Sequence, residues 1–192
     1  MTTPRSMENA GLEGKALLDE AAQHGEQYAA TCGACAPAAF AAVMDTLGYA
    51  EDPVMRELYA ASIGLTGGVG LTSVGTCGAI TGAAMAISFS FGLHREDIES
   101  NPTKAFAVSA AVGELARRVE AAYGDIECQE IQFALWGKSF RFTNADALAE
   151  FVTFIRDERS GFKCNKLTGA VSAWAVELIL KHNPSFCRRT KA

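Results

Sequence analysis

The chain has 192 residues, of which 49% are hydrophobic and 20% are charged, and its formal net charge is -5. A chain of this length suits one domain with a core large enough to fold without disulfides. The mild acidity and the lack of a basic stripe argue against a nucleic-acid-binding protein, because nothing could replace the counterions of the phosphates.

Polar residues make up the N-terminal stretch MTTPRSMENAGLEGK, which contains no apolar run of the kind found in a secretory signal. We therefore expect a cytoplasmic protein. In that reducing compartment cysteines are metal ligands or redox thiols more often than structural disulfides. The six cysteines of this chain are more than packing alone requires.

The first part of the chain predicts three helices. One covers Glu8–Ala30, where apolar residues recur at helical spacing between charged ones. The next is rich in alanine, covers Ala36–Leu47 and ends at Gly48, because glycine readily adopts the left-handed conformation that follows many helices. The third covers Asp52–Ser62 and has a proline in its first turn, where proline is tolerated.

A glycine-rich loop, Gly64–Thr76, leads from these helices into a helix over Cys77–Phe91. The stretch from Leu58 to His94 contains no Asp, Glu, Lys or Arg and is long enough to span a membrane. Its glycines, serines and threonines favour a central helix buried in a soluble domain instead, so we expect no membrane insertion. The same uncharged stretch is a candidate contact surface for a homodimer.

Further elements follow in the second half. They are a helix over Asn101–Tyr123, one or two helical turns over Cys128–Leu135, a short extended piece over Trp136–Phe142, a helix from Thr143 to Gly161 and a last helix over Cys164–His182. The start at Thr143 rests on the spacing of a capping box with Asp146. No strand-rich region and no internal repeat is visible. The sequence therefore predicts an all-α fold.

We expect this fold to be a single compact multi-helix domain over residues 1–192. An N-terminal helix (1–30) precedes a four-cysteine core (31–182), in which the glycine-rich loop leads into the central buried helix. A tail (183–192) carries the one basic cluster and is expected to be solvated.

Four of the six cysteines fall within a residue or two of a predicted helix start: Cys35, Cys77, Cys128 and Cys164. The N–H groups and the positive dipole end of a helix N-terminus stabilise a thiolate and lower its pKa. Four such ends that converge would form a cage for a cation or a metal cluster. The alternative is that each cysteine packs as a small hydrophobic residue in an alanine-rich core.

Glycines near these cysteines favour a bound group, since a missing side chain lets a cluster approach the backbone closely. Gly78 follows Cys77 directly and Gly68 lies in the preceding loop, so we expect both at the site. Glu127 and Glu130 flank Cys128 and are only weak candidates for proton transfer. The sequence thus assigns no catalytic residue and leaves open whether the protein is an enzyme.

Cys32-Gly-Ala-Cys35 forms a CxxC motif with two interpretations. It could be half of a metal knuckle, although no second close pair of cysteines exists. It could instead be a thioredoxin-like dithiol, although such a pair follows a strand that is not predicted here. Cys32 is therefore an alternate metal ligand or a disulfide partner of Cys35, and Cys187 is expected to be a peripheral thiol.

Three segments in succession resemble the redox-active C_GCAxxG_C_C family: Cys35-Ala36-Pro37 at the start of an alanine-rich helix, then GLTGGVG, then TCGAITGAAM. The family signature has one cysteine on an early helix, a glycine-rich loop leading into a CGAxxG helix start, and two cysteines downstream. The resemblance covers the chain from Tyr28 to Leu180. It places the four family cysteines, and the rest of the CGAxxG motif, at Cys35, Cys77, Cys128, Cys164, Gly78, Ala79 and Gly82.

The resemblance implies a small all-helical protein with redox-active cysteines. A related module occurs in split-Soret cytochromes, which carry haem and are associated with an iron–sulfur centre. This chain has no CxxCH motif, so covalently attached haem is not implied.

The leading hypothesis is a redox protein that holds one iron–sulfur cluster, of [2Fe–2S] or [4Fe–4S] type, on Cys35, Cys77, Cys128 and Cys164. It would exchange electrons with a redox partner protein or sense redox state. The ligands are far apart in the sequence, so tertiary structure would assemble the site. Two alternatives stay open: a metal-free thiol–disulfide oxidoreductase that uses Cys32 and Cys35, and a structural zinc domain with an interaction role.

Overall fold

The structure is a computed structural model that describes residues 4–155, 158–186 and 189. Within these residues no strand occurs, and the β-type pairing consists of an isolated antiparallel bridge between Thr76 and Glu127. The predicted all-α fold is therefore confirmed. Cys187, predicted to be peripheral, lies outside the described residues.

Helices account for most of the described chain. In order they are α1 (Pro4–Cys32), α2 (Cys35–Thr46), α3 (Pro53–Ser62), α4 (Gly78–Ser90), α5 (Arg95–Ser100), α6 (Ala105–Tyr123), α7 (Cys128–Trp136), α8 (Ala145–Ile155) and α9 (Glu158–His182). Two short 3₁₀ turns, η1 (Ile63–Leu65) and η2 (Pro102–Lys104), precede the glycine-rich loop and α6.

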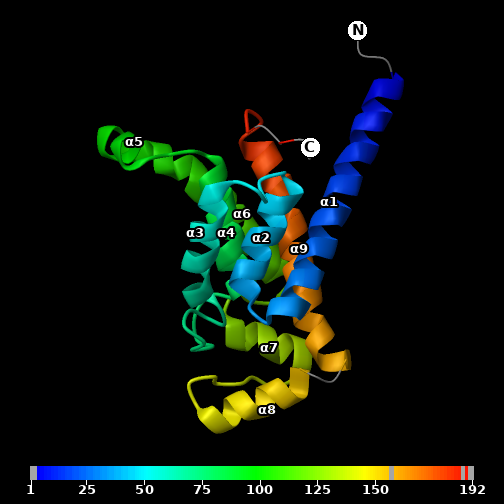
Figure 1. The fold of residues 1–192 in the computed structure, drawn as a ribbon, viewed down its shortest axis with the longest axis vertical. Coiled ribbons are helices and arrows are strands. Elements are labelled where there is room, and N and C mark those ends of the chain that lie inside the picture. Colours follow the sequence, from blue (N-terminus) through cyan, green and yellow to red (C-terminus); the bar gives the residue numbers. More distant parts are fainter. Residues whose placement is uncertain (1–3, 156–157, 187–188, 190–192) are drawn as a thin grey trace.

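Helix α9 packs against α1, α2, α4 and α6, and α4 packs against α2, α6 and α9. Figure 1 shows α1 and α9 running side by side along the molecule. Ala79, Ala83 and Ile87 of α4 are fully buried, so α4 is the central buried helix that the sequence predicts. At the lower end of Figure 1, α1 ends while α2, α4 and α9 begin, next to α7 and α8.

Glycines allow two pairs of these helices to touch at the backbone. A Cβ atom added at Gly82 of α4 would overlap the carbonyl oxygen of Ala36 in α2. A Cβ atom added at Gly169 of α9 would lie 2.6 Å from the carbonyl oxygen of Ala22 in α1. Neither position has room for the Cβ atom of any other residue, so the close packing around α4 and α9 depends on these glycines.

The boundary between the last two helices differs from the prediction. Helix α8 ends at Ile155 and α9 begins at Glu158, so Gly161 lies inside α9 and Cys164 lies in its second turn. The predicted helix end at Gly161 and helix start at Cys164 were therefore wrong. The reason is that one glycine inside a helix costs only about 1 kcal/mol, which packing against other helices readily outweighs.

Three smaller features also differ. Helix α5 was not predicted, although the backbone N–H of His94 donates to Asp97 Oδ2 at 3.1 Å, a capping arrangement that the sequence spacing could have revealed. The cap of α8 is Asn144, whose Oδ1 accepts from the Asp146 N–H at 2.8 Å, and not Thr143. The residues after Trp136 form no strand within the described chain.

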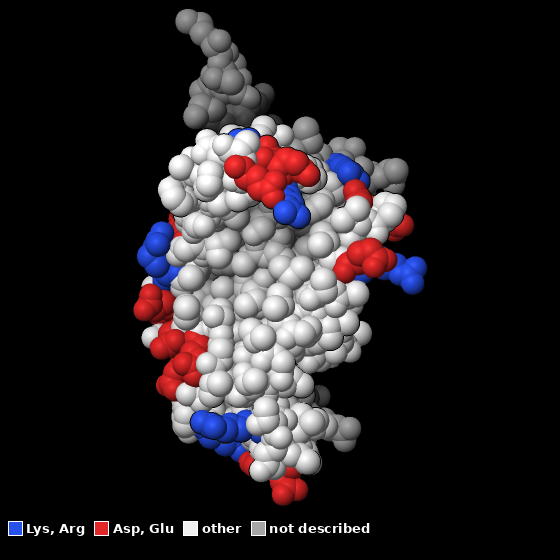
Figure 2. Space-filling model, turned by 90° about the vertical axis from the view of Figure 1, so that its left-hand side faces the viewer, with Lys and Arg blue, Asp and Glu red and all other residues white. Residues whose placement is uncertain are grey.

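No helix among the described residues has the length and apolar character that crossing a membrane requires. Figure 2 shows the left-hand side of Figure 1, where α3 and the glycine-rich loop lie, and the middle of this face carries few charged side chains. Exposed large apolar residues of α3, η1 and the loop are Val54, Tyr59, Ile63, Val69, Leu71 and Val74. The homodimer contact on this uncharged stretch remains a prediction.

We expect Gly82→Ala to lower the free energy of unfolding by about 2 kcal/mol or more, because the new Cβ atom forces α4 away from α2. Urea unfolding followed by circular dichroism measures the loss. The matched control is Gly14→Ala, at an exposed site on α1 where an added Cβ meets nothing within 4 Å, and it should raise stability by about 0.5–1 kcal/mol. Equal stability of Gly82→Ala and wild type would contradict the close packing of α2 and α4.

Candidate four-cysteine site

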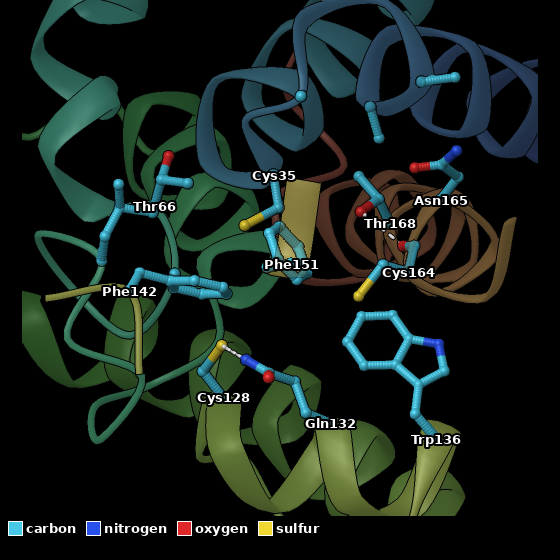
Figure 3. Close-up of a pocket in the computed structure, with 15 residues that line it drawn as sticks. Cys35, Thr66, Cys128, Gln132, Trp136, Phe142, Phe151, Cys164, Asn165 and Thr168 are labelled. Carbon is cyan, nitrogen blue, oxygen red and sulfur yellow. Dashed lines mark hydrogen bonds between the residues drawn. The ribbon is translucent and has the colours of Figure 1, made fainter. Parts of the chain in front are cut away.

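Three of the predicted cysteines line one cavity of about 170 Å³, at the end of the molecule where the helices converge. Cys35 is the first residue of α2, Cys128 is the first residue of α7, and Cys164 lies in α9. Figure 3 shows their side chains reaching the cavity from three different sides. The site is thus built by segments that are far apart in the sequence.

Cys77 is the fourth predicted cysteine and does not line the cavity itself. It directly precedes α4 and is only 6% exposed. Negative charge on Cys35, Cys128 or Cys164 would raise the pKa of Cys77 further, beyond the larger effect of its burial, so all four thiols lie within electrostatic range. The structure therefore brings the four predicted cysteines together, and all five described cysteines are free thiols.

A backbone joint holds the starts of α4 and α7 against each other. The N–H of Cys77 donates to the carbonyl of Ile126 at 2.8 Å, and the N–H of Cys128 donates to the carbonyl of Gly75 at 2.9 Å. These two bonds enclose the antiparallel bridge between Thr76 and Glu127. The positions of Cys77 and Cys128 are consequently fixed by main-chain geometry and not by side-chain packing alone.

The glycine-rich loop shapes the other side of the site. A Cβ atom added at Gly78 would collide with Cys35 Sγ, so the glycine lets the start of α4 approach that thiol. Thr66 and Gly67 line the cavity, whereas a Cβ atom added at Gly68 would collide with the backbone of Ser73 and Gly75 within the loop. Gly78 thus lies beside Cys35, and its role in binding remains a prediction. Gly68 does not line the cavity, and its role in binding remains a prediction.

Burial dominates the acid–base chemistry of the thiols. It raises the pKa of Cys128 from 9.0 to about 11, against an opposing hydrogen bond from Gln132. Burial also raises the pKa values of Cys35, Cys77 and Cys164. The sequence-based expectation of lowered pKa values was wrong, because desolvation outweighs the helix N-termini and Cys164 is not at one. Metal-free, the four groups are neutral thiols at pH 7.

Nearby N–H groups nevertheless favour negative charge on one of the sulfurs. The backbone N–H groups of Gly67, Cys35 and Ala36 act to lower the pKa of Cys35, although burial is the larger effect. These donors are positioned before any ligand arrives. They would stabilise a thiolate as soon as a cation compensates for the loss of water.

Aromatic rings form the rest of the cavity wall. Trp136 at the end of α7, Phe142 and Phe151 of α8 line it, and the Phe142 and Phe151 ring centroids are 4.5 Å apart. Phe140 and Phe154 extend this cluster away from the cavity, and Lys138 Nζ lies 4.6 and 4.3 Å from their centroids. The rings exclude water from the thiols and attach α8 to the domain.

The sequence prediction ended this helix at Leu135 and missed that one of its faces lines the cavity. Cys128, Gln132 and Trp136 are four residues apart on α7 and therefore lie on one side of it, and all three line the cavity. The four-residue spacing could therefore have shown from the sequence that these three side chains share one face of the helix. No sequence signal indicated that Thr66 and Phe151 line the cavity, because the positions of the loop and of α8 follow only from the tertiary fold.

The remaining predicted candidates lie outside the cavity. Cys32 is exposed at the end of α1, and its thiol donates to the carbonyl of Ala34 at 3.3 Å. Glu127 precedes α7 and Glu130 is exposed, and neither lines the cavity. Within the described part of the chain, no three His, Cys, Asp or Glu side chains are close enough together to hold one metal ion.

We expect the metal-free protein to lose stability between pH 9 and pH 11 through Cys128. Its folded-state pKa is raised, so folding disfavours the thiolate, and this contribution is complete below pH 9 and is lost as pH rises to about 11. The loss amounts to about 3 kcal/mol. Urea unfolding under reducing conditions measures it, with Cys128→Ala as control. Identical pH dependence in the two proteins would contradict the raised pKa.

A protein-family model matches the part of the chain that builds this site. A family model described as "Putative redox-active protein (C_GCAxxG_C_C)" matches residues 33–178, which include all four site cysteines. No curated protein and no solved structure matches the chain. The family match extends over most of the sequence and over the helices that build the cavity. The chain therefore belongs to the C_GCAxxG_C_C family of redox-active proteins.

Proposed function

We propose that this protein binds one iron–sulfur cluster, of [2Fe–2S] or [4Fe–4S] type, and uses it for electron transfer or redox sensing. The thiolates of Cys35, Cys77, Cys128 and Cys164 would hold it. The observation that carries the proposal is the convergence of these four thiols, from α2, α4, α7 and α9, on one buried site. Cysteine thiolates are the usual ligands of such clusters.

Three features of the site fit this group. The donor set is four soft sulfur atoms, which suit iron–sulfur clusters better than hard cations. Gly78 has no Cβ atom, which would overlap Cys35 Sγ, so the backbone at the start of α4 comes close to that sulfur. The hydroxyl of Thr66, which is 8% exposed and lines the cavity, has no hydrogen-bond partner among the described residues. A bound group with acceptor atoms would satisfy that hydroxyl.

The arrangement favours a cluster over a single ion. One tetrahedral zinc ion needs its sulfur ligands about 2.3 Å from a common centre. The described residues contain no such compact group, and their thiols surround a cavity instead. A cluster distributes its ligands over several irons, so its cysteines need not meet at a point. The structural zinc domain is consequently the weaker alternative.

The metal-free dithiol alternative also fits less well. An attacking thiol must be accessible and must have a lowered pKa. Cys32 is accessible, but its CxxC partner Cys35 lines the buried cavity, and burial raises the pKa of Cys35. Cys32 is also the last residue of α1, whereas the attacking cysteine of a thioredoxin-like motif lies at the N-terminus of a helix.

When bound, the cluster supplies one-electron transfer to and from a redox partner protein. The chain's own residues would control that chemistry. The rings of Trp136, Phe142 and Phe151 exclude water, and backbone N–H groups at Cys35 stabilise negative charge on sulfur. Because the empty site holds neutral thiols, ligation must release protons, and cluster assembly should become more favourable as pH rises.

The test is anaerobic purification followed by a visible spectrum and assays for iron and acid-labile sulfide. We expect a brown wild-type protein and loss of most of the iron in Cys77→Ser, because serine oxygen is a poor substitute for a thiolate ligand. Cys32→Ser is the matched control, since Cys32 does not line the cavity, and it should keep its iron. A colourless wild-type protein, or equal loss from Cys32→Ser, would refute the proposal.

A further inference from the structure

Gln132 is a buried polar residue whose side chain is fixed at both ends. It lies on α7, is 2% exposed and lines the cavity. Its Nε2 is 3.2 Å from Cys128 Sγ, and its Oε1 accepts from the Phe140 N–H at 2.8 Å. Figure 3 shows the amide pointing toward the sulfur of Cys128.

The orientation of this amide follows from its partners. A backbone N–H can only donate, so the group that faces Phe140 must be the carbonyl oxygen of Gln132. The NH₂ group must then face Cys128, and the sulfur must accept its hydrogen. A sulfur that accepts from a buried amide is better suited to the anionic, metal-bound form than to a thiol that needs an acceptor for its own proton.

The amide is also prevented from rotating. The segment that contains Phe140 is tied down by Ser73, a fully buried residue whose Oγ donates to the Phe140 carbonyl at 2.5 Å. The carbonyl of Ser73 in turn accepts from the N–H of Gln129 on α7 at 2.8 Å. The loop, α7 and the segment after it thus form a closed set of hydrogen bonds, which holds the donor aimed at Cys128 without reorganisation.

We propose that Gln132 is a positioning residue that donates a hydrogen bond to the Cys128 thiolate and thereby raises the reduction potential of the bound cluster. This inference rests on the cluster proposed above. Reduction adds one negative charge, which spreads onto the ligating sulfurs, so a donor to one sulfur stabilises the reduced state more than the oxidised state. The effect is strong here because the site excludes water.

The key variant is Gln132→Glu. Its carboxylate keeps an oxygen for the Phe140 N–H but replaces the NH₂ donor with a second oxygen that faces Cys128. Gln132→Met removes the donor without adding charge and covers the case of a variant that does not fold. The matched control is Gln129→Glu, which adds the same charge on the same helix, three residues away, at a side chain that contacts Glu130 on the surface.

Voltammetry of the anaerobically purified proteins measures the reduction potential. Both Gln132 variants should have a lower potential than wild type with unchanged iron and sulfide content, and Gln132→Glu should fall well below Gln129→Glu. A potential in both Gln132 variants that equals wild type, or a shift in Gln132→Glu no larger than that in Gln129→Glu, would overturn the role of Gln132.

A second measurement uses the metal-free protein and separates the two proposals. Alkylation of Cys128 by iodoacetamide is read by peptide mass spectrometry, relative to exposed Cys32 in the same sample. Loss of the donor should slow Cys128 on the order of tenfold in Gln132→Met, with no change in Gln129→Glu. A wild type without cluster would refute the function alone, whereas unchanged alkylation would refute the contact itself.

Discussion

The starts of α4 and α7 are joined by two backbone hydrogen bonds, from Cys77 to Ile126 and from Cys128 to Gly75, and the site depends on that joint. It sets two thiols next to each other before any side chain contributes. The close contact of α4 with α2, made possible by Gly82 and Gly78, brings Cys35 to the same place. Helix α9, packed against all the other core helices, adds Cys164. The glycines of the family motif therefore let the helices come close enough to bring the sulfur atoms near one another.

Local sequence signals predicted most of the helices and pointed to the four cysteines that the fold brings near one another. Alanine-rich runs, Gly48 and Gly124 after helix ends and proline in first turns give most boundaries, because these effects act within one turn. The start of α9 could not be read in this way, since tertiary packing overrides the preference of Gly161. The cavity wall was visible only in part: the shared face of Cys128, Gln132 and Trp136 follows from helical spacing, but Thr66 and Phe151 arrive from elsewhere in the fold.

The pKa values were misjudged for a related reason. A helix N-terminus is a local feature that can be inferred from sequence, whereas desolvation is a property of the assembled core. In the structure the second effect is larger for Cys35, Cys77 and Cys128. The hydrogen-bond donors of the site thus favour negatively charged sulfur atoms, whereas burial of the site disfavours them. This combination suits sulfur atoms that become negatively charged only when a metal cation binds to them and compensates for the loss of water.

The order in which the ligands occur along the chain has a consequence for biosynthesis. Cys35 lies on α2 near one end of the sequence, and Cys164 lies on α9 near the other. Helix α9 also packs against α1, which is synthesised before it. No nascent chain that lacks α9 contains the complete donor set or the partner that covers α1. The site is therefore finished only after α9 has been synthesised, and any group that it accepts must be delivered to a polypeptide that already contains α9.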